Sequence, residues 1–158
     1  MTDRDSEGAP AIYVDADACP VKNEVYKVAE RHGVQVHVVS NSFLQVPRLP
    51  FVTQTVVDAG PDEADNWIAD RAGKADIVIT ADILLAERCI EGGAVVLQPN
   101  GRAYTAVNIA SAVATRALME QLRSTGDQMG GAPPFSARDR SAFLQALHEA
   151  LVKLKRRA

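Results

Sequence analysis

The chain has 158 residues, of which 47% are hydrophobic and 23% are charged, and its formal net charge is −3. This size and composition predict one globular domain with a sizeable core, and they argue against a disordered chain. The negative net charge gives no general attraction to nucleic acid. A phosphate-bearing ligand would therefore need a local basic patch or a bound cation.

Membrane and secretory classes find no support in the sequence. No apolar run approaches the roughly 18 residues that a membrane span needs, so we expect no membrane contact. The first ten residues, "MTDRDSEGAP", lack the basic and apolar regions of a secretory signal, and we predict that residues 1–10 are disordered. Cys19 and Cys89 have no metal-ligand spacing, which indicates two reduced thiols in a cytoplasmic protein. Cys19 precedes a predicted helix, where we expect a lowered thiol pKa.

Short apolar runs alternate with amphipathic stretches from residue 11 to residue 123. Pro20 fits the first turn of a helix, Gly33 ends that helix, and acidic residues open the next one. In chain order the pattern predicts a strand at 11–14, a helix from Pro20 to Gly33, strands at 34–39 and 52–57, a helix at 62–72, a strand at 76–80, a helix at 82–91, a strand at 94–97 and a helix at about 106–123.

Strands separated by helices predict a parallel sheet with helices on both faces. The runs 11–14 and 76–80 are nearly all apolar, as central strands are, whereas 34–39 and 52–57 carry polar residues typical of strands nearer an edge. We therefore predict a three-layer α/β fold with strand order 3-2-1-4-5.

The composition changes after residue 123. The stretch "STGDQMGGAPPFSARDR" has the glycine, proline and serine content of a loop. A helical pattern then resumes, with Phe143, Leu147, Leu151 and Leu154 along one stripe. We expect residues 124–158 to form a loop and a C-terminal helical extension that packs on the domain formed by residues 11–123.

Carboxylates gather where the predicted sheet reverses its connections. Strand one ends in Asp15 and Asp17, and strand four leads into Asp82. Ligands of such sheets bind beyond the carboxyl ends of the strands, at the reversal between strands one and four. Asp65, in the acidic "DEAD" stretch, begins a helix at the same rim. Each Asp also has a structural interpretation, since Asp62 and Asp82 are well placed to cap helices.

Several carboxylates in one place repel one another unless a cation neutralises them. An oxygen-only ligand set suits Mg²⁺ or Mn²⁺, which clamps phosphates and lowers the pKa of bound water. We predict a metal site of Asp15, Asp17, Asp65 and Asp82, with Asp15, Asp65 and Asp82 catalytic. The predicted chemistry is phosphodiester or phosphomonoester hydrolysis. Candidate substrate contacts, or ordinary polar loop residues, are Asn41, Arg48, Thr80 and Arg102.

Four stretches carry a family resemblance: "VDADACPVKNEV", "DEADNWI", "VITADILLAERCIEGGAVVLQPNGRAYT" and "GDQMGGAPPFSARDRSAF". Over residues 11–152 the chain resembles the YaiI/YqxD family of uncharacterised bacterial proteins. The resemblance implies a PIN-like fold, whose better-studied members are Mg²⁺- or Mn²⁺-dependent ribonucleases. It gives Asp15, Asp65 and Asp82 the places of the PIN-like acidic residues and makes Asp17 an additional carboxylate. The roles of the glycine pair 130–131 and of "RDR" are open, with Arg138 a further candidate substrate contact.

The function that we predict from these features is that of a metal-dependent nuclease acting on a phosphodiester, with RNA the expected substrate. One alternative is a PIN-like protein that binds RNA or a protein without catalysis, although the sequence shows no aromatic stacking platform for RNA. A lower alternative is a phosphatase of the haloacid-dehalogenase type, because Asp15 and Asp17 form an Asp-x-Asp motif. In that motif, Thr or Val normally stands at the position where this chain has Cys19. No feature favours DNA, and the sequence leaves the oligomeric state open.

Overall fold

A computed structural model describes residues 9–126 and 134–157. The disorder predicted for residues 1–10 falls mostly outside this range, and so does the glycine pair 130–131. The elements in chain order are β1 (Ala11–Asp15), α2 (Lys22–His32), β2 (Gln35–Ser40), β3 (Val52–Val56), α3 (Glu63–Arg71), β4 (Asp76–Ile79), α4 (Ile83–Glu91), β5 (Val95–Leu97), β6 (Ala103–Tyr104), α5 (Ile109–Ser124) and α6 (Ala137–Arg157).

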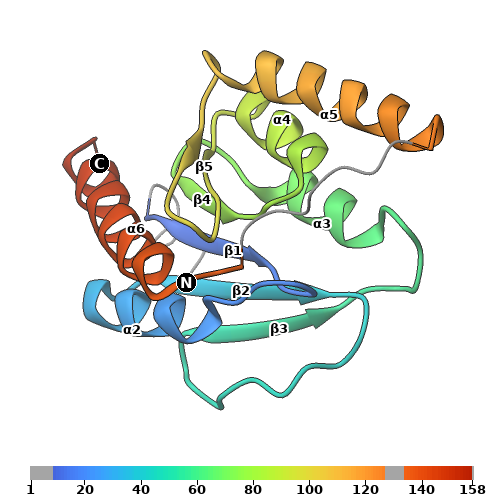
Figure 1. The fold of residues 1–158 in the computed structure, drawn as a ribbon. Helices are drawn as coiled ribbons and strands as arrows, with labels where there is room; N and C mark the ends of the chain where they lie inside the picture. Colours follow the sequence, from blue (N-terminus) through green and yellow to red (C-terminus); the bar gives the residue numbers. More distant parts are fainter. Residues whose placement is uncertain (1–8, 127–133, 158) are drawn as a thin grey trace.

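The described strands form one sheet in the order β3-β2-β1-β4-β5-β6 (Figure 1). β1 to β5 are parallel, which confirms the predicted order 3-2-1-4-5. β6 was not predicted and pairs antiparallel with β5. The α/β class and the C-terminal helical extension are also confirmed.

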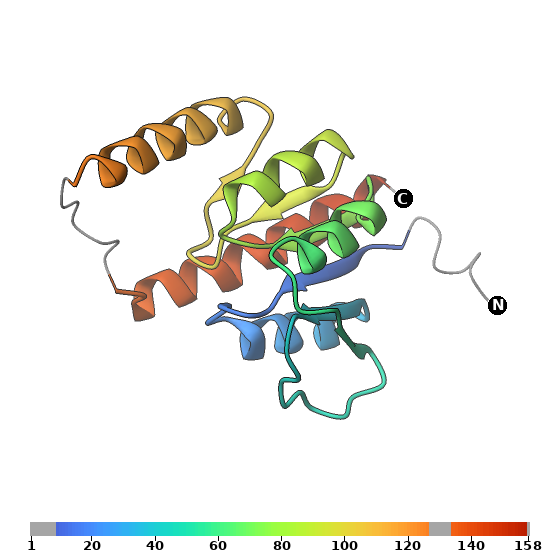
Figure 2. The same cartoon turned by 90° about the vertical axis from the view of Figure 1, so that its right-hand side faces the viewer.

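Helices cover both faces of the sheet, so the fold has three layers (Figures 1 and 2). On one face, β1 side chains such as Val14 pack with Val25 of α2 and Phe143 of α6 in one apolar cluster. On the other face, Tyr13 packs with Ile68 of α3 and Leu85 of α4 in a second cluster. Alternate β1 residues thus point to opposite faces, as the pleat of a strand requires.

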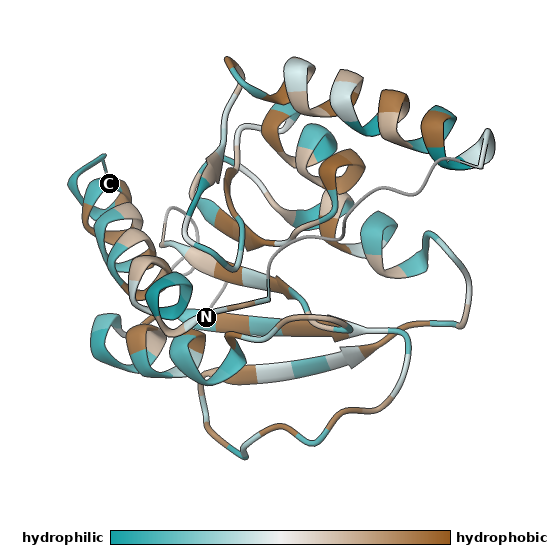
Figure 3. Ribbon diagram, in the orientation of Figure 1, coloured by the Kyte–Doolittle hydropathy of each residue, from teal (hydrophilic) through white to brown (hydrophobic). Residues whose placement is uncertain are grey.

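Polarity along the strands explains their places in the sheet. Ile12, Val14, Ile77 and Ile79 of the central strands are fully buried. The edge strand β3 carries polar residues, visible as pale and teal segments in Figure 3. There Gln35 Nε2 donates to Thr53 Oγ1 at 2.9 Å, so polar side chains pair with each other along this edge.

Glycine marks the end of α2, but proline does not mark its start. Gly33 has φ +68 and its N–H bonds to the end of the helix, as the sequence predicted. The predicted start at Pro20 is too early, because the helix begins at Lys22. Pro20 belongs instead to the loop that leaves β1, and this loop carries Asp17.

The two C-terminal helices differ in how they are held. The four predicted core residues of α6, from Phe143 to Leu154, are all buried, whereas Ile109 is the single buried residue of α5. α6 therefore belongs to the core, while α5 lies outside α4 (Figure 1). No helix in residues 9–126 and 134–157 has the combination of length and apolar character needed to cross a membrane.

Candidate active site at the carboxyl edge of the sheet

A cavity of about 310 Å³ lies beyond the carboxyl ends of β1 and β4. The predicted acidic residues Asp15, Asp17, Asp65 and Asp82 all line it. They come from the end of β1, the loop after it, the first turn of α3 and the start of α4. We call this the acidic cavity. The topology thus brings together four carboxylates that are spread over the sequence.

Thr80 holds Asp15. The Thr80 side chain is buried, and its hydroxyl donates to Asp15 Oδ2 at 2.7 Å. The same hydroxyl oxygen accepts a hydrogen bond from the Asp82 backbone N–H at 3.0 Å. Burial raises the pKa of Asp15, the Thr80 bond opposes this, and the nearby Asp82 and Asp17 charges raise it further. One buried hydroxyl therefore fixes the relative positions of two acidic residues.

The loop after β1 is tied down on both sides of Asp17. Asp17 Oδ2 accepts from the Asn41 backbone N–H at 3.0 Å. Lys22 Nζ donates to the carbonyl oxygens of Ala16 at 3.2 Å and Cys19 at 3.0 Å. Because these bonds come from the loop after β2 and from α2, the position of Asp17 depends on the packing of both.

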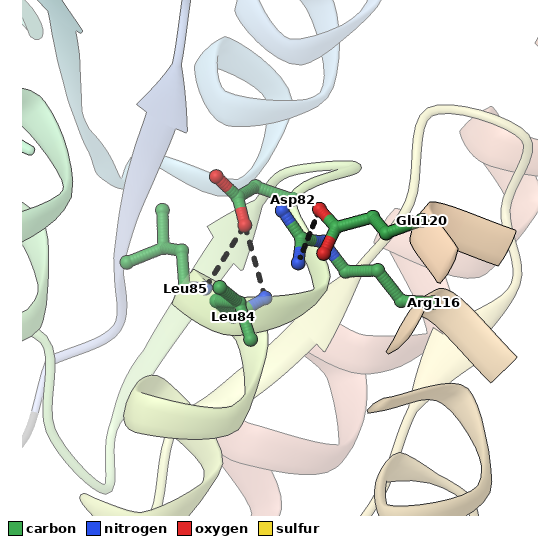
Figure 4. A network of polar contacts seen from close by, with 5 residues as sticks. All are labelled: Asp82, Leu84, Leu85, Arg116 and Glu120. Atoms are coloured by element: carbon green, nitrogen blue, oxygen red, sulfur yellow. Dashed lines mark hydrogen bonds and ion pairs between the residues drawn. The ribbon is translucent and has the colours of Figure 1, made fainter. Parts of the chain in front are cut away.

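Asp82 caps α4, which confirms the structural interpretation of this residue. Its Oδ1 accepts from the backbone N–H groups of Leu84 at 2.9 Å and Leu85 at 3.2 Å. In Figure 4 its other carboxylate oxygen points away from the helix backbone. Capping uses one oxygen only, so it leaves the second available for another role. Asp62 occupies the equivalent place before α3 without a side-chain cap bond.

Asp65 carries the largest electrostatic perturbation of the four acids. Burial raises its pKa to about 6, and the charges of Asp82, Asp15 and Asp62 contribute to the rise, against Arg88. Arg88 is also engaged elsewhere, since its Nη1 donates to Asn66 Oδ1 at 2.8 Å. The charges of the neighbouring carboxylates thus disfavour the ionised form of Asp65.

The donor set fits a hard divalent cation in its chemistry, because it offers several carboxylate oxygens and accumulates negative charge. Asp15, Asp17 and Asp82 each have one oxygen that accepts no hydrogen bond from the described residues. Nevertheless, within residues 9–126 and 134–157 no three His, Cys, Asp or Glu side chains are grouped closely enough to hold a metal ion. The acids line one cavity without being gathered into a ligand shell.

The other predicted site residues fall into two groups. Thr80 and Asn41 line the acidic cavity, and the Asn41 amide donates to the carbonyl oxygens of Asp58 and Gly60 at 3.2 and 3.4 Å. Arg102 lines a second cavity of about 620 Å³. Arg48 and Arg138 are exposed and line neither cavity. Substrate contact by these five residues stays a prediction.

The expectation for Cys19 was wrong. Burial raises the pKa of this thiol, and the Asp15 and Glu24 charges add to that rise, against Lys22 and a backbone hydrogen bond. The position of Cys19 before a helix does not offset the effect of desolvation on its pKa. A largely protonated, buried thiol is a poor nucleophile.

Sequence reasoning named Arg102 as a candidate contact but did not predict the second cavity that it lines. It shares Ala18, Ala81 and Pro99 with the acidic cavity, so the two are adjacent. Its wall includes Phe135, which reaches the rim from the segment before α6. The available signal was the turn "QPNGR" directly after β5, which ends at the same edge of the sheet as β1 and β4.

Fold and site together define an α/β protein with a parallel sheet and an acidic cavity at its carboxyl edge. A family model described as "Uncharacterized BCR, YaiI/YqxD family" matches residues 13–153. The chain belongs to this family, as its motifs predicted. The likeness to PIN-like domains stays a prediction.

The chain is similar to bacterial relatives named "UPF0178 protein". It is 58% identical to one from Azorhizobium caulinodans over 145 residues, which is 92% of this chain and 91% of the relative. A relative from Sphingopyxis alaskensis is 57% identical over 149 residues, 94% of this chain and 97% of the relative. One from Nitrobacter winogradskyi is 53% identical over 145 residues, 92% of each chain. No solved structure matches the chain.

Proposed function

We propose that the protein is a divalent-metal-dependent nuclease that hydrolyses RNA phosphodiesters at the acidic cavity. The observation that carries the proposal is the convergence of Asp15, Asp17, Asp65 and Asp82 on one cavity at the reversal of the sheet. Like charges are costly together, and a cation offsets that cost. The resemblance to PIN-like ribonucleases supports the choice of substrate.

Asp15, Asp17 and Asp82 would hold the Mg²⁺ or Mn²⁺ ion. When bound, such an ion neutralises phosphate charge and lowers the pKa of a water molecule. Thr80 keeps the Asp15 carboxylate in position and links it to the start of α4. Asp65 is a further ligand or the base that orients water, and a carboxylate with a pKa of about 6 is suited to accept a proton near neutral pH.

Metal binding to the folded protein is the first test. A ligand that binds only the folded state stabilises it by about 2.7 kcal/mol at 100 times its dissociation constant. We expect Mn²⁺ to raise the melting temperature of the wild type and of Asp76→Asn, whose carboxylate lies at the opposite edge of the sheet. Asp15→Asn should lose most of that response. Equal responses in wild type and Asp15→Asn would remove the metal site.

Cleavage is the second test. A pool of mixed RNA is incubated with the wild type and Mn²⁺, with EDTA replacing Mn²⁺ in a parallel sample. Cleavage that needs Mn²⁺ and disappears in Asp15→Asn supports the proposal. We place the reaction in the cytoplasm, where the two free cysteines stay reduced.

A protein that binds RNA without cleaving it is the second candidate. One observation favours it: no ligand shell for a metal ion is formed among the residues that the structure describes. RNA binding without Mn²⁺-dependent melting or cleavage would select this candidate. Trapping of a phosphoryl group on Asp15 would instead revive the phosphatase alternative.

A further inference from the structure

The second cavity adjoins the acidic cavity along the same rim. It measures about 620 Å³, a volume in the range of small-molecule sites. Its lining combines an aromatic ring, amide side chains and one guanidinium group, and this chemistry differs from that of the acidic cavity. The lining residues that the two cavities do not share are Pro20, Gln98, Asn100, Arg102, Phe135 and Asp139.

Arg102 supplies positive charge beside the acids. Among the described residues that line the two cavities, it is the one with a cationic side chain. The side chain is exposed and makes no ion pair or hydrogen bond to the part of the chain that the structure describes. Its guanidinium is therefore available to a ligand, and planar bidentate contacts make guanidinium groups good phosphate binders.

The turn that carries Arg102 is closed by several hydrogen bonds. The Arg102 N–H donates to Asn100 Oδ1 at 2.9 Å, and further bonds of 2.9 Å join Gln98 N to Arg102 O and Gly101 N to Gln98 O. Gly101 has φ +89, and a Cβ there would lie 2.7 Å from the backbone carbon of Ala142 in α6. The turn is thus both closed on itself and packed directly against α6.

Phe135 forms part of the opposite wall. The ring is partly buried against the core, and the Arg140 guanidinium lies over it at 5.0 Å from the ring centre. Arg140 Nη1 also donates to Pro20 O at 3.1 Å and pairs with Glu24 Oε2 at 3.0 Å. These contacts hold the ring at the edge of the cavity, where it adds an aromatic group to the lining that the sequence did not reveal.

Asp139 is the one acid among the described residues that line only this second cavity, and its charge is engaged. Its Oδ2 accepts from the Ser136 N–H at 3.0 Å, and its own N–H donates to Ser136 Oγ at 3.1 Å. This reciprocal pair caps the start of α6. The carboxylate is directed to the helix start, where the helix dipole offsets it.

We infer that the second cavity binds the nucleotide next to the scissile phosphate of single-stranded RNA. Arg102 contacts the flanking phosphate and Phe135 stacks on the base. Bases in a duplex have both faces covered, so a single ring at a cavity edge selects an unpaired base. The inference rests on the proposed function, because it places the scissile phosphate in the acidic cavity.

Binding of a short, fluorescently labelled single-stranded oligoribonucleotide tests the inference, with Ca²⁺ in place of Mn²⁺. We expect Phe135→Leu to weaken binding at least about five-fold, the lower end of the range for loss of one stacked base. Arg102→Gln should weaken binding and lower the slope of log affinity against log salt by about one. The matched control is Arg123→Gln, an exposed arginine on α5, which should bind as the wild type does.

Each outcome decides the inference. Unchanged binding by both Arg102→Gln and Phe135→Leu overturns it, as does an absence of binding by the wild type or equal binding of the same RNA in a duplex. Arg102 is exposed, so its variant stays informative even if Phe135→Leu melts early. Nuclease activity is measured separately with Mn²⁺. Cleavage with unchanged variant binding rejects the inference alone, whereas specific binding without cleavage rejects the nuclease and leaves the second cavity as a binding site for unpaired RNA without a neighbouring scissile phosphate.

Discussion

Cavities lie at both ends of the parallel strands. The cavity at the amino ends, which we call the amino edge, is larger than the acidic cavity at the carboxyl ends. That amino-edge cavity measures about 670 Å³ and is lined by Tyr13, His37 and Asp76, among others. The acidic cavity at the carboxyl edge measures about 310 Å³. Volume alone would select the amino edge. The distinguishing property is the number of like charges: Asp76 is the one carboxylate lining the amino-edge cavity among the described residues.

At the amino edge, the titratable side chains are hydrogen-bonded or have a pKa shifted toward the neutral form. Asp76 Oδ2 accepts from the Gly73 N–H at 2.8 Å, and His37 stacks on Tyr13 with 4.7 Å between ring centres. Burial raises the pKa of Asp76 and lowers that of His37, so it disfavours both charges. At the carboxyl edge, burial is joined by like charges: Asp82, Asp15 and Asp62 add to the rise in the pKa of Asp65, and Asp82 and Asp17 add to that of Asp15. A protein has little structural reason to accumulate such repulsion, which is why we assign the function to this edge.

The largest expected effect is on RNA cleavage, and it should differ between variants at the carboxyl edge and at the amino edge. Asp82→Asn should lower Mn²⁺-dependent RNA cleavage at least about 100-fold, the upper end of the loss seen on removing a partner around a metal site. Asn is also a good helix cap, so folding should be retained. Asp76→Asn should keep cleavage close to that of the wild type. Initial rates on one RNA substrate measure both, and equal losses would mean that the acidic cavity has no special role.

Removing the Thr80 hydroxyl should destabilise the carboxyl edge. Thr80→Val keeps the shape but leaves Asp15 without its donor, and we expect a loss of about 1–3 kcal/mol in the free energy of unfolding. Thr80→Ser keeps the hydroxyl and serves as the control. Urea unfolding of the metal-free proteins provides the comparison. If Thr80→Val unfolds with the same free energy as the wild type, the hydrogen bond contributes nothing to stability.

Asp65 should make the metal-free protein less stable at neutral pH. Its pKa of about 6 in the folded state lies above the ordinary 3.8. The folded state therefore holds the proton more tightly, and this stabilisation is present below pH 4 and lost as pH rises through 6. Asp65→Asn should raise stability at pH 7 by about 1 kcal/mol, after allowance for solvent screening of a partly exposed group. Melting temperatures of both proteins from pH 4 to pH 8 test this, and parallel curves would show that the pKa of Asp65 is not raised in the folded state.

The smallest effect is expected at the amino edge. Burial lowers the pKa of His37 and the Asp76 charge opposes this. The folded state thus disfavours the charged ring, and stability should be lost as pH falls below the ordinary value of 6.5. In His37→Gln this part of the acid-side loss should disappear. Calorimetry between pH 5 and pH 7.5 measures the difference, and an unchanged pH profile would show that His37 does not titrate with unfolding.

Much of the fold follows from local patterns. Apolar runs, helix periodicity and glycine at helix ends predict β1 to β5 and their helices, and the polarity of β2 and β3 places them toward an edge. β6 could not be predicted in this way, because its two residues, Ala103 and Tyr104, are too few to show a periodic pattern. It exists because the turn after β5 returns the chain to the sheet.

Like the fold, the candidate site was predictable from the sequence only in part. Parallel strands bring their carboxyl ends to one rim, so the grouping of Asp15 and Asp82 is predictable. The burial that raises the pKa of Cys19 comes from tertiary packing and is invisible in the sequence. Phe135 is a similar case, because α6 carries it to the rim by packing on α2 and β5. Contacts between distant segments decide both outcomes.

The pairing of α2 with α6 has a consequence for synthesis on the ribosome. α2 emerges before α6, and Phe143, Leu147 and Leu151, which cover the same sheet face, are translated more than a hundred residues after it. The nascent chain must carry an uncovered apolar surface for most of its elongation. Contacts of such long sequence separation slow folding and favour association with chaperones or with other unfinished chains. Premature termination before α6 should therefore yield aggregates rather than a smaller folded unit.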